Sequence, residues 1–112
     1  MIYGKTHIGL VRDTNEDAIF YDEVNNLMII ADGIGGHARG EDASNKAIET
    51  LKAFIYKNNH AYGNKEQLLL DGFVEANKAV HNIQNALPDG KICGTTLTCT
   101  LVSDGILYFA HV

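Results

Sequence analysis

The residues best suited to chemistry are the Asp and the glycines that follow an apolar run early in the chain. The run covers residues 27–31 and leads directly into Asp32 and Gly33, with further glycines at 35 and 36. Five consecutive apolar residues predict a buried strand, and a carboxylate at the end of such a strand needs a partner. A cation held by the Asp32 carboxylate and a nearby backbone carbonyl fits this pattern. A turn in which Asp32 caps glycine-rich backbone fits it equally well, and this segment alone leaves both alternatives open.

The same glycines also match a dinucleotide-binding pattern, G-x-G-x-x-A, from Gly33 to Ala38. A dinucleotide site needs a second strand soon after the helix, with an acidic residue for the ribose. Here the next strand-like segment begins near Thr95, and an Asp before the first glycine would repel a pyrophosphate. No G-K-[ST] sequence is present, which excludes a Walker loop. The match to a dinucleotide site is therefore weak.

A second charged segment precedes the apolar run, from Arg12 to Asp17. A guanidinium offers paired donors for phosphate oxygens, and carboxylates suit water-mediated binding of Mg²⁺ or Mn²⁺. Adjacent side chains of an extended strand point to opposite faces, so at most one of Glu16 and Asp17 points directly into a site. Taken alone, such a segment is more often a solvated turn.

The composition is typical of one soluble globular domain of 112 residues, with 46% hydrophobic and 21% charged residues. A net charge of −5 argues against nucleic acid as a partner. No apolar run approaches the roughly 18 residues of a membrane span, and the N-terminus lacks the features of a signal peptide. Cys93 and Cys99 have no metal-type spacing and are expected to stay reduced. We therefore expect a cytoplasmic protein that makes no contact with membranes.

The hydrophobic pattern predicts an α+β domain in the order β-β-β-α-α-β-β. The expected strands cover residues 2–11, 18–21, 27–31, 95–102 and 106–112. A helix is expected over 41–57, and Asn64 with Gln67 has the form of a capping box that opens a second helix, ended by residues 88–90. The sequence Ser103-Asp104-Gly105 indicates a hairpin. These elements predict an antiparallel sheet with a helical pair on one face.

Three motifs together resemble the metal-dependent protein phosphatase 2C family in its bacterial form. The motifs are Arg12-x-x-Asn15-Glu16-Asp17, then Ala31-Asp32-Gly33-x-Gly35-Gly36-His37-x-x-Gly40-Glu41-x-Ala43-Ser44, then Gly94-Thr95-Thr96. They occur in the family's order and spacing and cover essentially the whole chain. The resemblance implies a β-sandwich of two antiparallel sheets flanked by helix pairs, of which residues 1–112 form the N-terminal half of a single, truncated domain. It also implies hydrolysis of phosphoserine and phosphothreonine in proteins through a metal-activated water, with two or three Mn²⁺ or Mg²⁺ ions.

The resemblance assigns a role to each residue of the expected site. Asp32 bridges the two principal metals, and Gly33 offers its carbonyl to one of them. Glu16 and Asp17 hold metal-bound waters, and Arg12 binds the substrate phosphate. No protein nucleophile is required.

The proton donor is a departure from the family pattern. Many eukaryotic members carry a His directly after the Asp-Gly pair, where this chain has Ile34. His37 is a candidate substitute as the proton donor. As a lone His beside a helix start, it is more often explained as a surface residue.

The resemblance also implies partners and sets limits. It implies phosphoproteins as substrates and a serine/threonine kinase as the opposing enzyme. The family domain is about twice this length and carries further acidic motifs downstream, so the isolated chain is expected to be weak or inactive. The open apolar faces and edge of half a sandwich favour aggregation or pairing with another chain. The alternative function is a catalytically silent module that acts through binding, and a Ca²⁺-binding protein is disfavoured because no D-x-D-x-D-G loop occurs.

Overall fold

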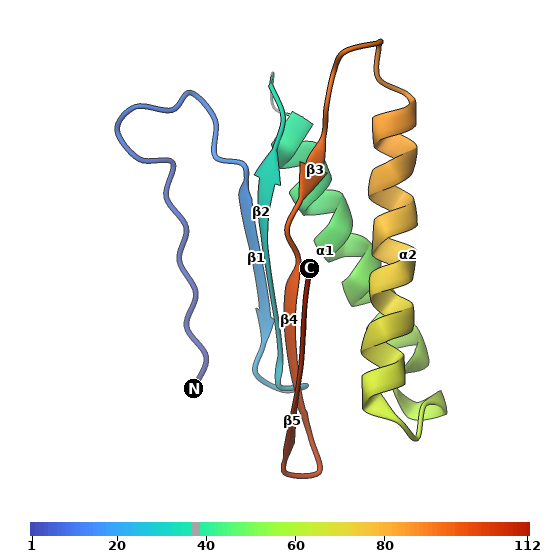
Figure 1. Cartoon of the computed structure of the whole chain (residues 1–112). Helices are drawn as coiled ribbons and strands as arrows, with labels where there is room; N and C mark the ends of the chain where they lie inside the picture. The colour runs from blue at the N-terminus through green and yellow to red at the C-terminus, as the bar shows by residue number, and fades with distance from the viewer. Residues whose placement is uncertain (37–38) are drawn as a thin grey trace.

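The computed structural model describes residues 1–36 and 39–112, which form one antiparallel sheet with two long helices on one of its faces (Figure 1). The strands are β1 (Asp17–Asp22), β2 (Leu27–Ile34), β3 (Gly94–Thr95), β4 (Thr98–Ser103) and β5 (Ile106–His111). The helices are α1 (Arg39–Asn58), the short 3₁₀ helix η1 (Asn59–Ala61) and α2 (Lys65–Asn85). The sheet order is β1-β2-β4-β5, and β3 pairs with the end of β2. No helix in the described ranges is long and apolar enough to cross a membrane.

Strict alternation along β2 decides which side chains form the core. Leu27, Ile29 and Ala31 are fully buried toward the helices, whereas Met28 and Ile30 are exposed on the other face. The helices complete the core with the following buried residues: Ala47, Leu51 and Ile55 of α1, and Leu68, Leu69 and Ala76 of α2. Because side chains of a strand repeat every two residues, Asp32 lies on the helix-free face with Met28 and Ile30.

Two hairpin turns connect the long strands, and the one between β4 and β5 is the hairpin that the sequence predicts. Asp104 and Gly105 both have positive φ, 52° and 74°, as a two-residue hairpin turn requires. In the β1–β2 turn the Asp22 carboxylate accepts hydrogen bonds from the Val24 amide, at 2.9 Å, and from the Tyr56 hydroxyl of α1, at 2.6 Å. The second contact ties α1 to the turn.

The start of α2 confirms the predicted cap only in part. The Asn64 side chain accepts a hydrogen bond from the Gln67 amide at 3.2 Å, as expected for an N-cap. The Gln67 side chain donates to Asp71 at 2.7 Å instead of returning to Asn64. The helix is therefore capped, but the reciprocal bond of a capping box is missing.

Two predicted strands need correction. Residues 2–11 form no strand, because Gly9 adopts a φ of +86° at a turn and no neighbouring strand pairs with this segment. The predicted strand over 95–102 is divided into β3 and β4, since the Thr96 hydroxyl and amide both bond to Asp32 between them. The observed order is therefore β-β-α-α-β-β-β, not the predicted β-β-β-α-α-β-β.

Candidate functional site

Asp17 and Asp32 form a carboxylate pair at one end of the sheet. They are direct partners in the β1–β2 register, so their side chains lie on the same face. Burial raises the pKa of Asp17, and the hydrogen bond and negative charge of Asp32 raise it further, against the opposing charge of Arg12. Two carboxylates this close repel each other unless a proton or a cation lies between them. The pair therefore fits a hard divalent cation such as Mn²⁺ or Mg²⁺, which prefers oxygen ligands.

Thr96 fixes the backbone of Asp32 from the other side. The Asp32 amide donates to Thr96 Oγ1 at 3.0 Å, and the Thr96 amide donates to the Asp32 carbonyl at 2.9 Å. Both backbone groups of Asp32 are satisfied in this way, which leaves its carboxylate as the group presented to solvent. Thr96 belongs to the Gly94-Thr95-Thr96 motif, but its positioning role was missed by the sequence analysis, since it depends on a contact 64 residues apart.

Gly33 lies where β2 meets the start of α1. Its amide donates to the Glu16 carbonyl at 3.1 Å, and in an extended strand the carbonyl of a residue points to the same edge as its N–H. A Cβ at this position would lie 2.0 Å from the Gly40 carbonyl oxygen. Only glycine therefore fits, and its carbonyl is directed toward the Glu16 side, where the resemblance assigns it to a metal.

Glu16 and Asp17 diverge, as the alternation of an extended segment predicts. A Cβ on Gly40, in the first turn of α1, would lie 2.6 Å from the Glu16 carboxyl carbon. The Glu16 carboxylate therefore rests against the N-terminal turn of α1, which favours negative charge. Asp17 instead joins Asp32, while Asn15 holds the Asp17 amide through a side-chain hydrogen bond of 3.1 Å.

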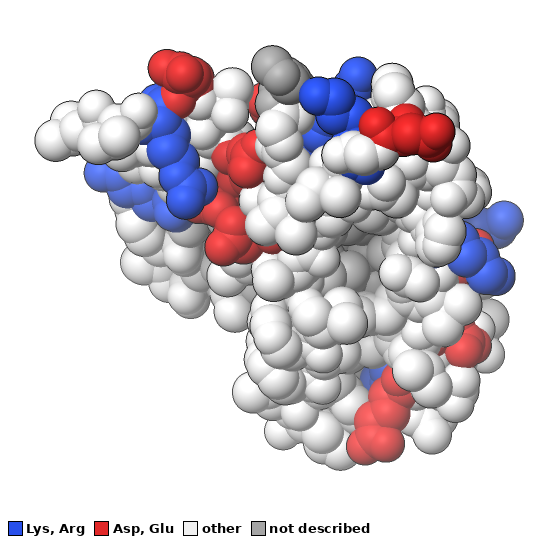
Figure 2. Space-filling view, turned by 45° about the horizontal axis from the view of Figure 1, so that its top comes forward, with Lys and Arg blue, Asp and Glu red and all other residues white. Residues whose placement is uncertain are grey.

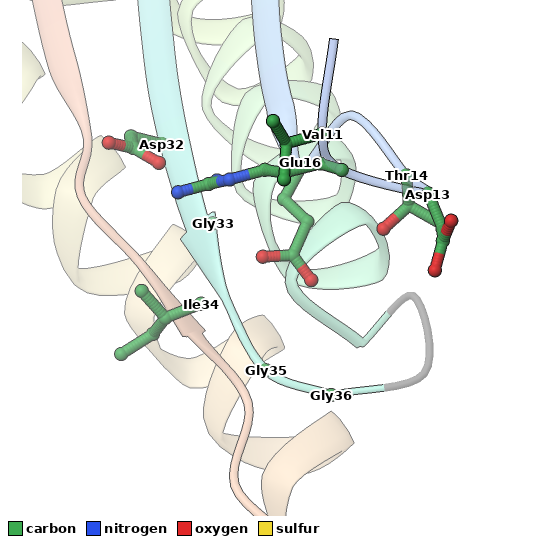
Figure 3. A pocket seen from close by; sticks show the side chains of 10 residues that line it. Val11, Asp13, Thr14, Glu16, Asp32, Gly33, Ile34, Gly35 and Gly36 are labelled. Carbon is green, nitrogen blue, oxygen red and sulfur yellow. The ribbon is translucent and has the colours of Figure 1, made fainter. Parts of the chain in front are cut away.

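An open pocket of about 750 Å³ lies beside the carboxylate pair and is lined by Asp32 but not by Asp17 (Figure 3). Arg12, Glu16 and Asp32 are among its lining residues, together with the glycine segment 33–36. In Figure 3, Asp32 and Glu16 lie on either side of the strand end at Gly33, and Asp13 lies farther away along its loop. Figure 2 shows acidic and basic side chains next to one another at one end of the visible face, much of which is otherwise uncharged.

Arg12 lines the pocket without an ion-pair partner among the described residues, where the ion pairs are Arg39–Asp42 and Lys78–Glu75. Its exposed guanidinium is thus available to an anion. His37, the candidate proton donor, lies outside the described residues. Within residues 1–36 and 39–112, no group of three or more His, Cys, Asp or Glu side chains is gathered to hold a metal. These described ranges therefore offer a pair of carboxylates and not a full ligand set.

The family model described as Protein phosphatase 2C matches residues 3–112. The serine/threonine protein phosphatase PstP of Mycobacterium tuberculosis is 36% identical over 105 residues, which is 93% of this chain and 20% of that protein. The serine/threonine phosphatase stp of Listeria monocytogenes is 30% identical over 114 residues, which is 96% of this chain and 45% of that protein.

Solved structures give the same similarity in three dimensions. The crystal structure of the M. tuberculosis phosphatase PstP/Ppp superposes with a TM-score of 0.83 and 32% identity, over 96% of this chain and 44% of that one. A structure of the PstP catalytic domain in complex with two manganese ions also gives a TM-score of 0.83 and 32% identity, over 45% of its chain. The chain thus spans less than half the length of these relatives.

Proposed function

Because this chain belongs to the protein phosphatase 2C family, we propose that it provides the Asp17–Asp32 part of the metal centre of a protein serine/threonine phosphatase. The observation that carries the proposal is the pairing of these two carboxylates across β1 and β2, beside a pocket lined by Arg12. The relative with the two manganese ions supports metal dependence.

The residues present fit Mn²⁺ or Mg²⁺ on chemical grounds. Asp32 supplies a direct oxygen ligand, and its pairing with Asp17 places a second carboxylate beside it, so that here Asp17 is proposed as a direct ligand instead of the water-mediated role that the resemblance implies. The Gly33 carbonyl is directed toward the same end of the sheet, and Glu16 is placed to act through water. When bound, such ions lower the pKa of a coordinated water and offset negative charge on a phosphoryl group. The resemblance sets their number at two or three in a complete domain.

Arg12 performs the other part of the chemistry. Its guanidinium donates to the non-bridging oxygens of a phosphate in the pocket, which positions the phosphorus and stabilises the charge that develops on these oxygens. The Thr96 clamp and the close contact of Gly33 with Gly40 keep the Asp32 carboxylate in a fixed position, so little reorganisation is needed when substrate arrives. The proton donor to the leaving alkoxide remains a proposal for His37.

The proposed substrates are phosphoserine and phosphothreonine residues of proteins, with a serine/threonine kinase as the opposing enzyme. We test this with the purified chain at high concentration, Mn²⁺ and a phosphothreonine peptide, by measuring released phosphate. The expected result is slow release that disappears in Asp32→Asn and after chelation of the metal. Release that is equal in Asp32→Asn would contradict the proposal.

A silent binding module is the second candidate function. It is favoured by one observation, the lack of a third gathered ligand within the described parts of the chain. Such a module would bind a phosphopeptide through Arg12 without hydrolysing it. Peptide binding without any Mn²⁺-dependent release of phosphate would support this candidate over the phosphatase.

A further inference from the structure

The first residues of the chain are attached to β1 and to the turn that follows it. We call residues 2–6 the arm. The Ile2 amide donates to the Glu23 carboxylate in the β1–β2 turn, and a Cβ on Gly4 would lie 3.0 Å from the Ile19 side chain of β1. Figure 1 shows the N-terminal segment running beside β1 before it turns back toward the start of that strand. The arm therefore has a fixed place against the sheet.

Residues 7–14, which we call the Arg12 loop, join the arm to the segment that enters β1. The turn at Gly9 has a φ of +86°, and the Gly9 amide donates to His7 Nδ1 at 2.9 Å. In Figure 1 this loop extends away from the sheet beyond the start of β1. It supplies four lining residues of the open pocket, which are Val11, Arg12, Asp13 and Thr14. The place of the Arg12 guanidinium therefore depends on what holds the two ends of the loop.

A side-chain hydrogen bond between Thr6 and Asn15 closes the Arg12 loop at its base. Asn15 Nδ2 donates to Thr6 Oγ1 at 2.9 Å, and Asn15 Oδ1 accepts from the Asp17 amide at 3.1 Å. A backbone amide can only donate, so the Asn15 oxygen faces Asp17 and its nitrogen faces Thr6. One carboxamide thus connects the arm, the loop and the strand that carries Asp17.

We propose that Thr6 and Asn15 are positioning residues, which hold Arg12 in the pocket beside Asp32 by closing the Arg12 loop against the arm. The proposal rests on the proposed role of Arg12 in binding phosphate. Ordering a flexible loop costs conformational entropy, and a loop that is closed before the substrate arrives avoids part of this cost at binding. Because Asn15 also bonds to the Asp17 amide, it keeps the phosphate-binding group and the metal-binding carboxylate in one relative position.

The two bonds of Asn15 can be separated by experiment. Valine has nearly the shape of threonine but lacks the hydroxyl, so Thr6→Val removes the acceptor of the Asn15 nitrogen. The bond from the Asp17 amide to Asn15 spans only two residues and does not involve Thr6. Asp32 is held independently by Thr96. Thr6→Val should therefore affect phosphate binding and spare metal binding.

The test is the Kd of the purified chain for a phosphothreonine peptide, measured by calorimetry in a double-mutant cycle of Thr6→Val and Arg12→Ala. We expect Thr6→Val to weaken peptide binding about threefold or more. In a chain that already carries Arg12→Ala, Thr6→Val should have no further effect, because both changes act through the same guanidinium. Thr6→Ser keeps the hydroxyl and should bind like the wild type. The Kd of Thr6→Val for Mn²⁺ should stay within about twofold of the wild-type value.

Tyr62→Phe is the matched control, since it also removes a single hydroxyl that makes a side-chain hydrogen bond. The Tyr62 hydroxyl donates to Asp71 at 2.6 Å. Tyr62 lies between η1 and α2, and Figure 1 places this connection at the opposite end of the molecule from the start of β1. We expect Tyr62→Phe to leave the Kd for the peptide and for Mn²⁺ unchanged.

Several results would overturn the positioning role. If Thr6→Val binds the peptide like the wild type while Arg12→Ala binds weakly, the role of Thr6 is wrong and the proposed function stands. Thr6 acts elsewhere if Thr6→Val costs as much affinity in the Arg12→Ala chain, or if Thr6→Ser fails to restore binding. A Thr6→Val chain that is unfolded by circular dichroism makes Thr6 a structural residue. A wild-type chain that binds no phosphothreonine peptide overturns the proposed function and the positioning role together.

Discussion

The substitution Gly33→Ala tests the close packing beneath the candidate metal centre. The added Cβ would lie 2.0 Å from the Gly40 carbonyl oxygen and 2.8 Å from the Glu16 carbonyl oxygen. Both obstacles are backbone atoms, so no side-chain rotation relieves the contact, and β2 must move away from α1. Overpacking costs about 1–3 kcal/mol, and loss of the hydrogen bond from the Gly33 amide to Glu16 adds about 0.5–1.5 kcal/mol. We expect a total loss of about 2–4 kcal/mol in the free energy of unfolding.

Thermal and urea denaturation measure this loss. All variants are compared at one protein concentration, because any self-association would make the apparent stability depend on concentration. For a domain of this size the expected fall in Tm is about 10–20 °C. Gly36→Ala is the matched control, because no atom of the described residues is recorded within 4 Å of its added Cβ and its φ is not positive. Its stability should stay within about 0.5 kcal/mol of the wild type. Equal stability of the two variants would refute the described contact of β2 with α1.

Three further predictions concern single side chains. Arg12→Ala should weaken binding of a phosphothreonine peptide about tenfold or more, as measured by calorimetry, and should leave the Tm almost unchanged. A large fall in Tm with normal peptide binding would instead show that Arg12 stabilises the fold. Tyr56→Phe removes the main cause of the low Asp22 pKa of about 2. A lowered pKa stabilises the folded chain at pH values above the unfolded pKa near 3.9, and this stabilisation is lost as the pH falls toward 2. The difference in unfolding free energy between wild type and Tyr56→Phe should therefore disappear between these two pH values. Burial raises the pKa of Cys99 to about 12, so iodoacetamide should label it at neutral pH only on unfolding, and rapid labelling of the folded chain would contradict its burial.

The sequence was most informative where local physical rules act alone. The strand over residues 27–31, the Asn64 cap and the Asp104-Gly105 turn are each determined by neighbours close in the chain, and the structure confirms them. The strand is buried only at alternate residues, however, because Met28 and Ile30 face away from the helices. The split of the strand at Thr96 was not predictable from composition, because it depends on bonds to Asp32 far away in sequence. Residues 2–11 have strand-like composition but no partner strand, so β propensity alone gave the wrong prediction there.

In the candidate site, too, some features follow from the local sequence and others depend on contacts far apart in the chain. The alternation rule correctly separated Glu16 from Asp17, but which of the two joins Asp32 follows from the β1–β2 register. The position of Glu16 against Gly40 depends on the contact of β2 with α1, which no local pattern encodes. The metal roles of these residues and the phosphate role of Arg12 remain predictions that only binding and activity measurements test.

Mn²⁺ binding to the purified chain tests the central claim most directly. Calorimetry or the electron paramagnetic resonance signal of free Mn²⁺ gives the Kd for the wild type, for Asp32→Asn and for Asp104→Asn, a control carboxylate in the distant β4–β5 turn. The account predicts that Asp32→Asn raises the Kd by about tenfold or more, while Asp104→Asn leaves it unchanged. Equal Kd values for the wild type and Asp32→Asn would contradict the assignment of the Asp17–Asp32 pair as the metal site.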